Sequence, residues 1–168
     1  MTHVMIDLET LGTSPGCAIV SIGACSFSRE GIDKVLYERI DVSDTRMRID
    51  PGTSCWWMRQ SDAARSVFNP GGFHAPAVLT IFSDWFHAVA GEQIWGHGAS
   101  FDAPILAAAY EFYELPCPFK FWNMRDTRTI YELAGVSPDR TAGTHHNALD
   151  DAKAQAEAVI KAWKVLGQ

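Results

Sequence analysis

The chain has 168 residues, of which 47% are hydrophobic and 20% charged, so residues 1–168 suit a single domain with a substantial core. Its net charge of −6 excludes a broad basic surface of the kind that binds duplex nucleic acid without sequence preference. No run of eighteen uncharged apolar residues occurs, and the acidic pair in MTHVMIDLET interrupts any signal peptide, so we expect no membrane partner and a cytoplasmic location.

Short apolar runs separated by turn residues predict three strands in the first forty residues. The turns are GTSPG at residues 12–16 and the Glu30-Gly31 pair. Strands that follow one another across short turns pair antiparallel. The sequence therefore predicts an antiparallel meander over residues 4–8, 18–27 and 34–40.

Helical spacing of apolar residues dominates the rest of the chain. Thr53 or Ser54 is expected to cap a helix through CWWMRQSDAARSVF, which the Asn-Pro-Gly-Gly cluster at residues 69–72 ends. A last helix is expected to begin after Asn147 and to stop at Gly167. Further helices are predicted over residues 75–89, 101–113 and 127–133, and strands over 93–96 and near 119–122. Five strands with these helices give an α/β domain with a mixed five-stranded sheet and flanking helices.

The four cysteines stand far apart and form no C-x-x-C pair. They are Cys17, Cys25, Cys55 and Cys117. No histidine spacing around them matches a zinc site, so reduced and mostly buried thiols are expected.

An acidic pair stands in the first predicted strand, where the pattern is otherwise apolar. Successive side chains alternate across a strand, so Asp7 and Glu9 project to one side while Ile6 and Leu8 pack on the other. Two carboxylates this close repel unless a cation holds both ionised, and oxygen ligands suit Mg²⁺ or Mn²⁺. A bound cation would also reverse the potential at an acidic pocket, so the net charge does not exclude a phosphodiester substrate. The alternative is that the pair ends the strand and caps a loop.

A third carboxylate, Asp102, follows a glycine-containing turn at the end of the strand predicted at residues 93–96. Ligands of α/β sheets gather at such strand ends. The alternative is that Asp102 is the N-cap of the next helix, with Pro104 in its first turn.

His146 and Asp151 lie five residues apart around the start of the last helix. This spacing lets an imidazole reach a site that the carboxylate also faces. The alternative is that His145 and His146 are exposed loop residues and that Asp150 and Asp151 complement the helix dipole.

The segments DLET, SFDAP and HNALDD, in this order, resemble the three exonuclease motifs of the DEDDh (DnaQ-like) superfamily. The third motif of that superfamily reads H-x-A-x-x-D, which His146, Ala148 and Asp151 match. The resemblance spans residues 4–160. The segments CWWMRQSD and GHGASFDAPIL are most similar to the RNase T-like group, which includes phage exodeoxyribonuclease VIII-like proteins and mycobacterial-type 3'-exoribonucleases.

This resemblance implies an RNase H-like fold, an intracellular bacterial or phage-encoded protein, and hydrolysis of RNA or DNA from a free 3' end. It implies two divalent cations, Mg²⁺ or Mn²⁺, and a homodimer. The implied metal ligands are Asp7, Glu9, Asp102 and Asp151. His146 would be the general base, a role that suits an imidazole with a pKa near 6.5. Family members often carry Asn at the position of His97, five residues before Asp102, and place a structural aspartate near Asp126.

Substrate contacts are predicted next to these groups. Thr10, Leu11 and Gly12 directly follow the acidic pair and are expected to approach the terminal nucleotide, where Leu11 would wedge beside the last base. The alternative, which the pattern favours for Leu11, is a buried core leucine. Trp57 and Phe101, like Trp56 and Trp122, are either base-stacking residues or core residues. The cations in FKFWNMRDTRT, which are Lys120, Arg125 and Arg128, either hold the phosphate backbone or form a solvated charged face.

Two other functional classes share some of these features. An RNase H-like endonuclease would share the sheet and the carboxylates, but the histidine of H-x-A-x-x-D favours an exonuclease. A non-catalytic nucleic-acid-binding module would leave the five chemical groups together unexplained.

Overall fold

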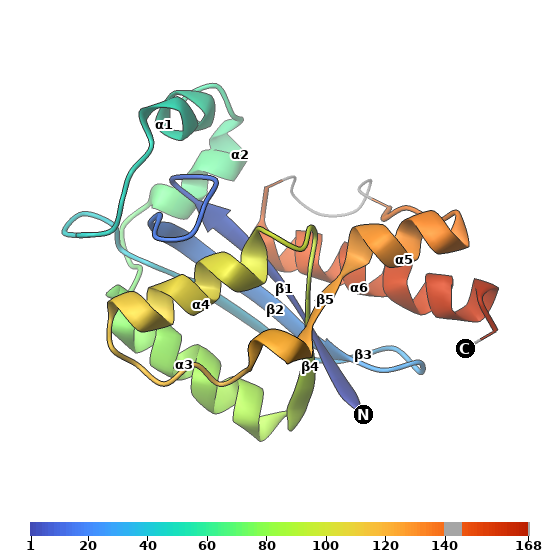
Figure 1. The fold of residues 1–168 in the computed structure, drawn as a ribbon. Coiled ribbons are helices and arrows are strands. Elements are labelled where there is room, and N and C mark those ends of the chain that lie inside the picture. The colour runs from blue at the N-terminus through green and yellow to red at the C-terminus, as the bar shows by residue number, and fades with distance from the viewer. Residues whose placement is uncertain (140–145, 168) are drawn as a thin grey trace.

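A mixed sheet of five strands runs through the protein in the order β3-β2-β1-β4-β5 (Figure 1). The computed structural model describes residues 1–139 and 146–167. The first three strands pair antiparallel as the sequence predicts, whereas β4 lies parallel to β1 and β5 parallel to β4. The strands are β1 (Thr2–Thr10), β2 (Ile19–Phe27), β3 (Ile32–Arg39), β4 (Gly91–Gly96) and β5 (Met124–Asp126).

Helices cover both faces of this sheet. In Figure 1, α3 and α4 lie on one side and α5 and α6 on the other, while α1 and α2 stand together beyond one end of β1. The helices are α1 (Pro51–Trp57), α2 (Asp62–Arg65), α3 (Ala75–Ala88), α4 (Asp102–Phe112), α5 (Thr127–Ala134) and α6 (Ala148–Val165), with 3₁₀ turns η1 (Ser66–Phe68) and η2 (Phe121–Asn123). Within the described residues, no helix is both long enough and apolar enough to cross a membrane.

Two clusters of buried side chains form the core, one on each face of the sheet. The larger one joins Ile6 and Leu8 of β1 to α3 and α4, and the smaller one joins Met5 of β1 to the alanine-rich face of α6. Small alanines let α6 lie close to the sheet. The approach is closest at Gly23 of β2, where an added Cβ would lie 2.1 Å from the carbonyl carbon of Ala148, so only glycine is accommodated there.

The long helix predicted after Thr53 is wrong, because two capping side chains divide the segment. The N-cap is Asp50, whose carboxylate accepts from the N–H groups of Gly52 and Thr53, and Pro51 occupies the first turn. The helix ends at Trp57, and Ser61 caps α2 as a separate helix by accepting from the Ala64 N–H.

The strand predicted near residues 119–122 is also displaced. These residues end in the turn η2, and the strand β5 follows at Met124–Asp126. By contrast, the structure confirms α3, α4 and α5 within two residues at each end, and it confirms Asn147 as the cap of α6, where its side chain accepts from the N–H groups of Leu149 and Asp150.

Candidate active site

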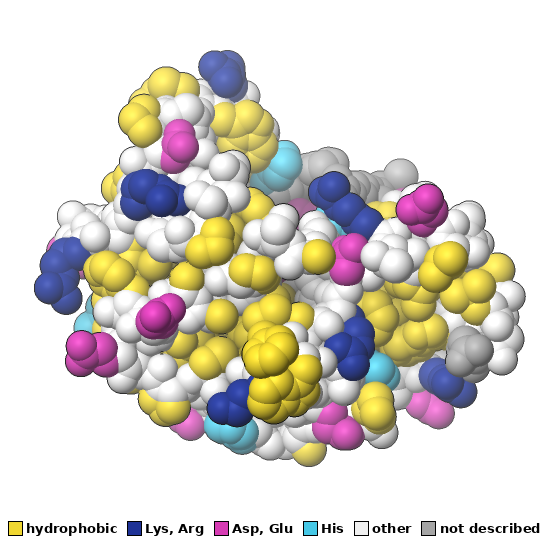
Figure 2. All heavy atoms as spheres, viewed as in Figure 1, with side chains coloured by type: hydrophobic (Ala, Val, Ile, Leu, Met, Phe, Trp, Pro, Cys, Tyr) yellow, Lys and Arg dark blue, Asp and Glu magenta, His cyan; other side chains and the backbone are white. Residues whose placement is uncertain are grey.

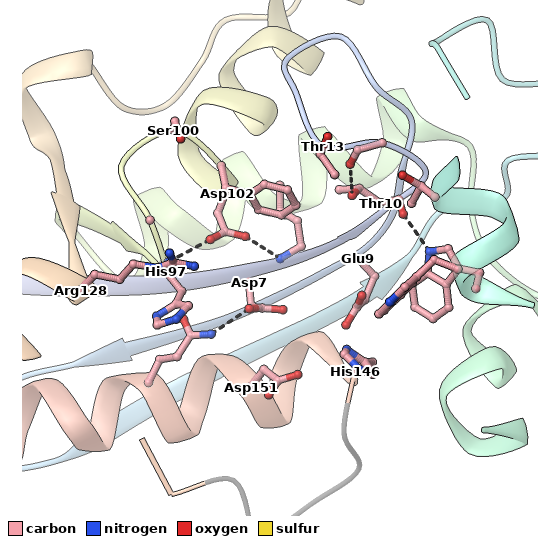
Figure 3. Close-up of a pocket in the computed structure, with 18 of the residues that line it drawn as sticks. Asp7, Glu9, Thr10, Thr13, His97, Ser100, Asp102, Arg128, His146 and Asp151 are labelled. Carbon is pink, nitrogen blue, oxygen red and sulfur yellow. Dashed lines mark hydrogen bonds between the residues drawn. The ribbon is translucent and has the colours of Figure 1, made fainter. Parts of the chain in front are cut away.

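A cavity of about 630 Å³ opens at the carboxyl ends of β1 and β4, and all five chemically active residues predicted from the sequence lie in its wall (Figure 3). They come from β1, α4 and the start of α6, which are far apart in the sequence. The residues that line the cavity are Asp7, Leu8, Glu9, Thr10, Gly12, Thr13, Gly52, Thr53, Trp56, Trp57, His97, Gly98, Ser100, Phe101, Asp102, Arg128, His146, Asp151 and Gln155.

The acidic pair on β1 faces α6, as the alternation of the strand predicts. Ile6 and Leu8 pack on the opposite face of the sheet against α3 and α4. The Glu9 side chain is only 7% exposed. In Figure 3, Asp7 and Glu9 both point across the cavity toward the start of α6. Two carboxylates therefore enter the same site from one strand.

The carboxylate of Asp102 joins β1 to the residue that follows β4 and does not cap its own helix. One carboxylate oxygen accepts from the Leu8 N–H at 3.1 Å, and the other accepts from the His97 N–H at 2.9 Å. The N-cap position of α4 is held by Phe101 instead, and no side chain accepts a hydrogen bond there. The N-cap alternative for Asp102 is thus wrong. The residue is 2% exposed at the start of α4, and its two hydrogen bonds fix the carboxylate.

His146 stands at the entrance to α6 with a positive φ of 62°. Its ring lies 4.9 Å from the Trp56 ring, centroid to centroid, in an edge-on contact. One donor atom each from Glu9, His146 and Asp151 lie within 4.8 Å of one another. The last segment therefore brings an imidazole and a carboxylate to Glu9 of the acidic pair, whereas His145 falls outside the described residues.

Burial and mutual repulsion act on these carboxylates together. Burial raises the pKa of Asp7 well above its ordinary value, and the charges of Asp102, Glu9 and Asp151 raise it further. The same two causes, burial first, raise the pKa of Glu9 to about 8. Burial raises the pKa of Asp102 to about 6, although the two backbone N–H donors oppose this rise. Without a cation, the site is therefore unfavourable in its fully ionised form.

Gln155 is a site residue that the sequence analysis missed. Its amide Nε2 donates to Asp7 Oδ1 at 2.8 Å, and the side chain is 3% exposed. The signal was its position one helical turn after Asp151 on α6, which places both side chains on one face of the helix. The opposite amide atom, Oε1, is buried and accepts no hydrogen bond from the described residues.

The predicted substrate contacts lie in two environments. Thr10, Gly12, Trp57 and Phe101 line the cavity, and the Trp57 indole N–H donates to the Thr10 carbonyl at 2.9 Å. Leu11 and Trp57 are 6% and 3% exposed and both belong to the larger core cluster, but only Trp57 also lines the cavity. These contacts with substrate stay predictions.

Comparisons with known proteins agree with this arrangement. The family model of the 3'-5' exoribonuclease Rv2179c-like domain matches residues 2–163. The chain belongs to this family. An exodeoxyribonuclease of Enterobacteria phage T4 is 27% identical to the chain over 173 residues, which cover 84% of the chain and 75% of the phage protein.

Solved structures of nucleases share the fold. The nuclease domain of 3'hExo, a DEDDh family member bound to rAMP, superposes with a TM-score of 0.65 at 14% identity and covers 97% of this chain and 92% of its own. Exonuclease X in complex with 5' overhanging duplex DNA superposes with a TM-score of 0.62 at 20% identity, and the match covers 99% of this chain and 93% of the exonuclease X chain. Pop2p of S. pombe, in its Mg²⁺- and Mn²⁺-bound form, superposes with a TM-score of 0.60 at 11% identity, and the match covers 96% of this chain and 82% of the Pop2p chain.

These matches confirm the predicted RNase H-like fold and the predicted enzyme class. The protein is a 3'-5' exonuclease, which hydrolyses nucleotides from 3' ends. His97 also lines the cavity, and its Nδ1 lies 2.9 Å from the Thr127 hydroxyl oxygen.

Proposed function

We propose that this exonuclease works with two divalent cations, Mg²⁺ or Mn²⁺, held by Asp7, Glu9, Asp102 and Asp151, and that His146 is the general base. The convergence of Glu9, Asp151 and His146 donor atoms within 4.8 Å carries the proposal. The form of Pop2p with Mg²⁺ and Mn²⁺ supports the choice of metal.

The donor set fits these ions. Carboxylate oxygens are the ligands that Mg²⁺ and Mn²⁺ prefer, and Mg²⁺ usually takes a few of them together with water and substrate phosphate. Burial and repulsion raise the pKa values of Asp7 and Glu9, so the ionised carboxylates lack compensating charge in the protein itself. A cation would supply that charge and hold the groups deprotonated.

Bound divalent cations would lower the pKa of the attacking water and neutralise charge at the phosphate and at the leaving 3' oxygen. The imidazole of His146 would take the proton of that water, because an ordinary histidine titrates close to neutral pH. Trp56 packs edge-on against this ring and limits its rotation. Gln155 would orient Asp7 through its 2.8 Å hydrogen bond.

The proposed substrate is a nucleic acid with a free 3' end, either RNA or DNA, and the proposed enzyme is an intracellular homodimer. The cavity of about 630 Å³ has the size of an ordinary small-molecule site, so it suits one terminal nucleotide rather than a duplex. The family description favours RNA and the phage relative favours DNA, so both are test substrates.

A gel time course on 5'-labelled single-stranded and 3'-overhang oligonucleotides of RNA and DNA tests the proposal, with Mg²⁺, Mn²⁺ or EDTA. We expect a metal-dependent ladder that shortens from the 3' end and that Asp102→Asn abolishes. Glu111→Gln is the matched control, since this exposed carboxylate also belongs to α4. Internal cuts would favour the endonuclease, and no cleavage with either metal would favour the binding module.

A further inference from the structure

The turn η2 carries the two most exposed Phe and Trp side chains of the described residues. Phe121 is 77% exposed and Trp122 is 61% exposed, and their rings meet edge-on with centroids 4.9 Å apart. Figure 2 shows a bulge of hydrophobic spheres with Lys or Arg spheres on either side, on the part of the face where Figure 1 draws the turn before β5. Large rings held in solvent beside cations mark a surface that fits a partner.

Three cations accompany these rings along β5 and into α5. They are Lys120, Arg125 and Arg128, and within the described part of the chain no carboxylate forms an ion pair with any of them. Arg125 Nη1 donates to the carbonyl oxygens of Trp122, at 2.8 Å, and of Met124, at 2.7 Å. The guanidinium is therefore fixed to the turn that presents the indole.

The one nearby carboxylate in this segment, Asp126, is occupied by internal hydrogen bonds. Its oxygens accept from the N–H groups of Gly98 and Arg128 and from the Thr129 hydroxyl, as the cap of α5. The segment from residue 120 to residue 128 thus carries a net charge of +2, from three cations and Asp126, in a protein whose net charge is −6.

This surface is continuous with the active site. A smaller cavity of about 100 Å³ is lined by Met124, Arg125 and Asp126, and it shares Gly98 with the large cavity. Arg128 lines the large cavity itself. With about 3.3 Å per strand residue and about 2 Å per residue of a 3₁₀ turn, Trp122 lies roughly 10 Å along the chain from Asp126.

We propose that the single strand preceding the 3'-terminal nucleotide leaves the active-site cavity across β5, with its phosphates held by Arg128 and Arg125 and a base stacked on Trp122 or Phe121. This inference rests on the proposed exonuclease function. Interleaved aromatic rings and cations are what proteins use to bind single-stranded nucleic acid, and the continuity of these residues with the active-site cavity favours this partner. We call residues 120–128 the upstream surface.

The test compares substrates that do and do not reach the upstream surface. The p-nitrophenyl ester of thymidine 5'-monophosphate fills the large cavity alone, and a single-stranded 12-mer extends beyond it. Trp122→Ala and Arg125→Ala are compared with Phe73→Ala and Lys161→Ala, which remove an exposed ring and an exposed cation elsewhere. We expect KM for the 12-mer to rise about tenfold in the first two variants, which corresponds to the loss of one stacked base or phosphate contact. Turnover of the ester by Trp122→Ala and Arg125→Ala stays at the wild-type level. Phe73→Ala and Lys161→Ala keep wild-type values for both substrates.

Binding is measured in parallel, so that the surface and the chemistry are judged separately. Fluorescence anisotropy of a labelled 12-mer with Asp102→Asn, alone and combined with Trp122→Ala, needs no turnover. Weaker binding of the combined variant supports the upstream surface, even if wild type cleaves neither substrate and the proposed function fails. Equal binding, or equal losses on the ester and the 12-mer, overturns the upstream surface. Light scattering provides a further check. If Trp122→Ala changes the protein from dimer to monomer while 12-mer binding is unchanged, the rings belong to a protein contact, and the upstream surface is overturned.

Discussion

Gly23 of β2 touches no substrate, yet its replacement by alanine should displace the catalytic end of α6. An ideal Cβ at this position would lie 2.1 Å from the Ala148 carbonyl carbon, 2.2 Å from the Leu149 nitrogen and 2.3 Å from the Ala148 oxygen. Carbon atoms pack at about 3.5–4.0 Å, so the start of α6 would have to move by roughly 1.5 Å. These neighbours are backbone atoms and have no rotamer that avoids the contact.

Two quantities should change in Gly23→Ala. Overpacking of this kind costs about 1–3 kcal/mol of the free energy of unfolding, and each kcal/mol lowers Tm by roughly 2–4 °C in a chain of this size. Because His146 and Asp151 flank the displaced residues, kcat/KM should fall about 100-fold, the effect expected of a misplacement near 1 Å. Thermal unfolding measures the change in Tm, and hydrolysis of the p-nitrophenyl ester measures the change in kcat/KM.

A neighbouring variant separates displacement from loss of stability. Ala24 is fully buried and faces the larger core cluster on the other side of β2. Ala24→Gly should also lower Tm, through lost packing and added backbone entropy, but it should keep kcat/KM near the wild-type value well below Tm. A Gly23→Ala protein with wild-type Tm and kcat/KM would refute the reasoning.

Three further predictions concern the site itself. Gln155→Leu should leave the protein folded but removes the hydrogen bond to Asp7. The affinity for Mn²⁺, measured by calorimetry, should therefore fall about 10–100-fold. An unchanged affinity would show that Asp7 needs no orienting partner. Because folding raises the pKa of Glu9 from 4.5 to about 8, the folded chain binds more protons than the unfolded chain between these values, and the stability of the metal-free protein should fall as pH rises from 5 to 8. Added Mg²⁺ should then raise Tm more at pH 8 than at pH 5.5 in scanning fluorimetry, and an equal gain at both values would contradict this. His146→Ala should lower kcat at least 100-fold with Mn²⁺ affinity within about threefold of wild type, and a parallel loss of metal affinity would make His146 a ligand rather than the base.

Local patterns predicted the elements that present the acidic residues. Alternation along β1 was enough to place Asp7 and Glu9 on one face. Asn147 was recognisable as a cap because asparagine before a helical pattern is a preferred N-cap residue, and its side chain accepts from the first turn as expected. The family resemblance added what the separate patterns left open, which was that these segments belong to one site.

Features that depend on tertiary contacts were not predictable in this way. The sequence around Trp57 has an unbroken helical appearance, but two side-chain caps divide it, Asp50 at the start of α1 and Ser61 at the start of α2. Asp102 has the pattern of an N-cap, but its carboxylate accepts from the N–H groups of Leu8 and His97 on other segments. The contact between Gln155 and Asp7 joins residues 148 positions apart.

The most direct test of the central claim is a crystal structure with MnCl₂ and a nucleoside 5'-monophosphate, in which anomalous scattering locates the metal. The account predicts two Mn²⁺ peaks about 3.5–4 Å apart, contacted by Asp7, Glu9, Asp102 and Asp151, and their loss in Asp7→Asn. Peaks elsewhere, or none between these carboxylates at saturating Mn²⁺, would contradict it.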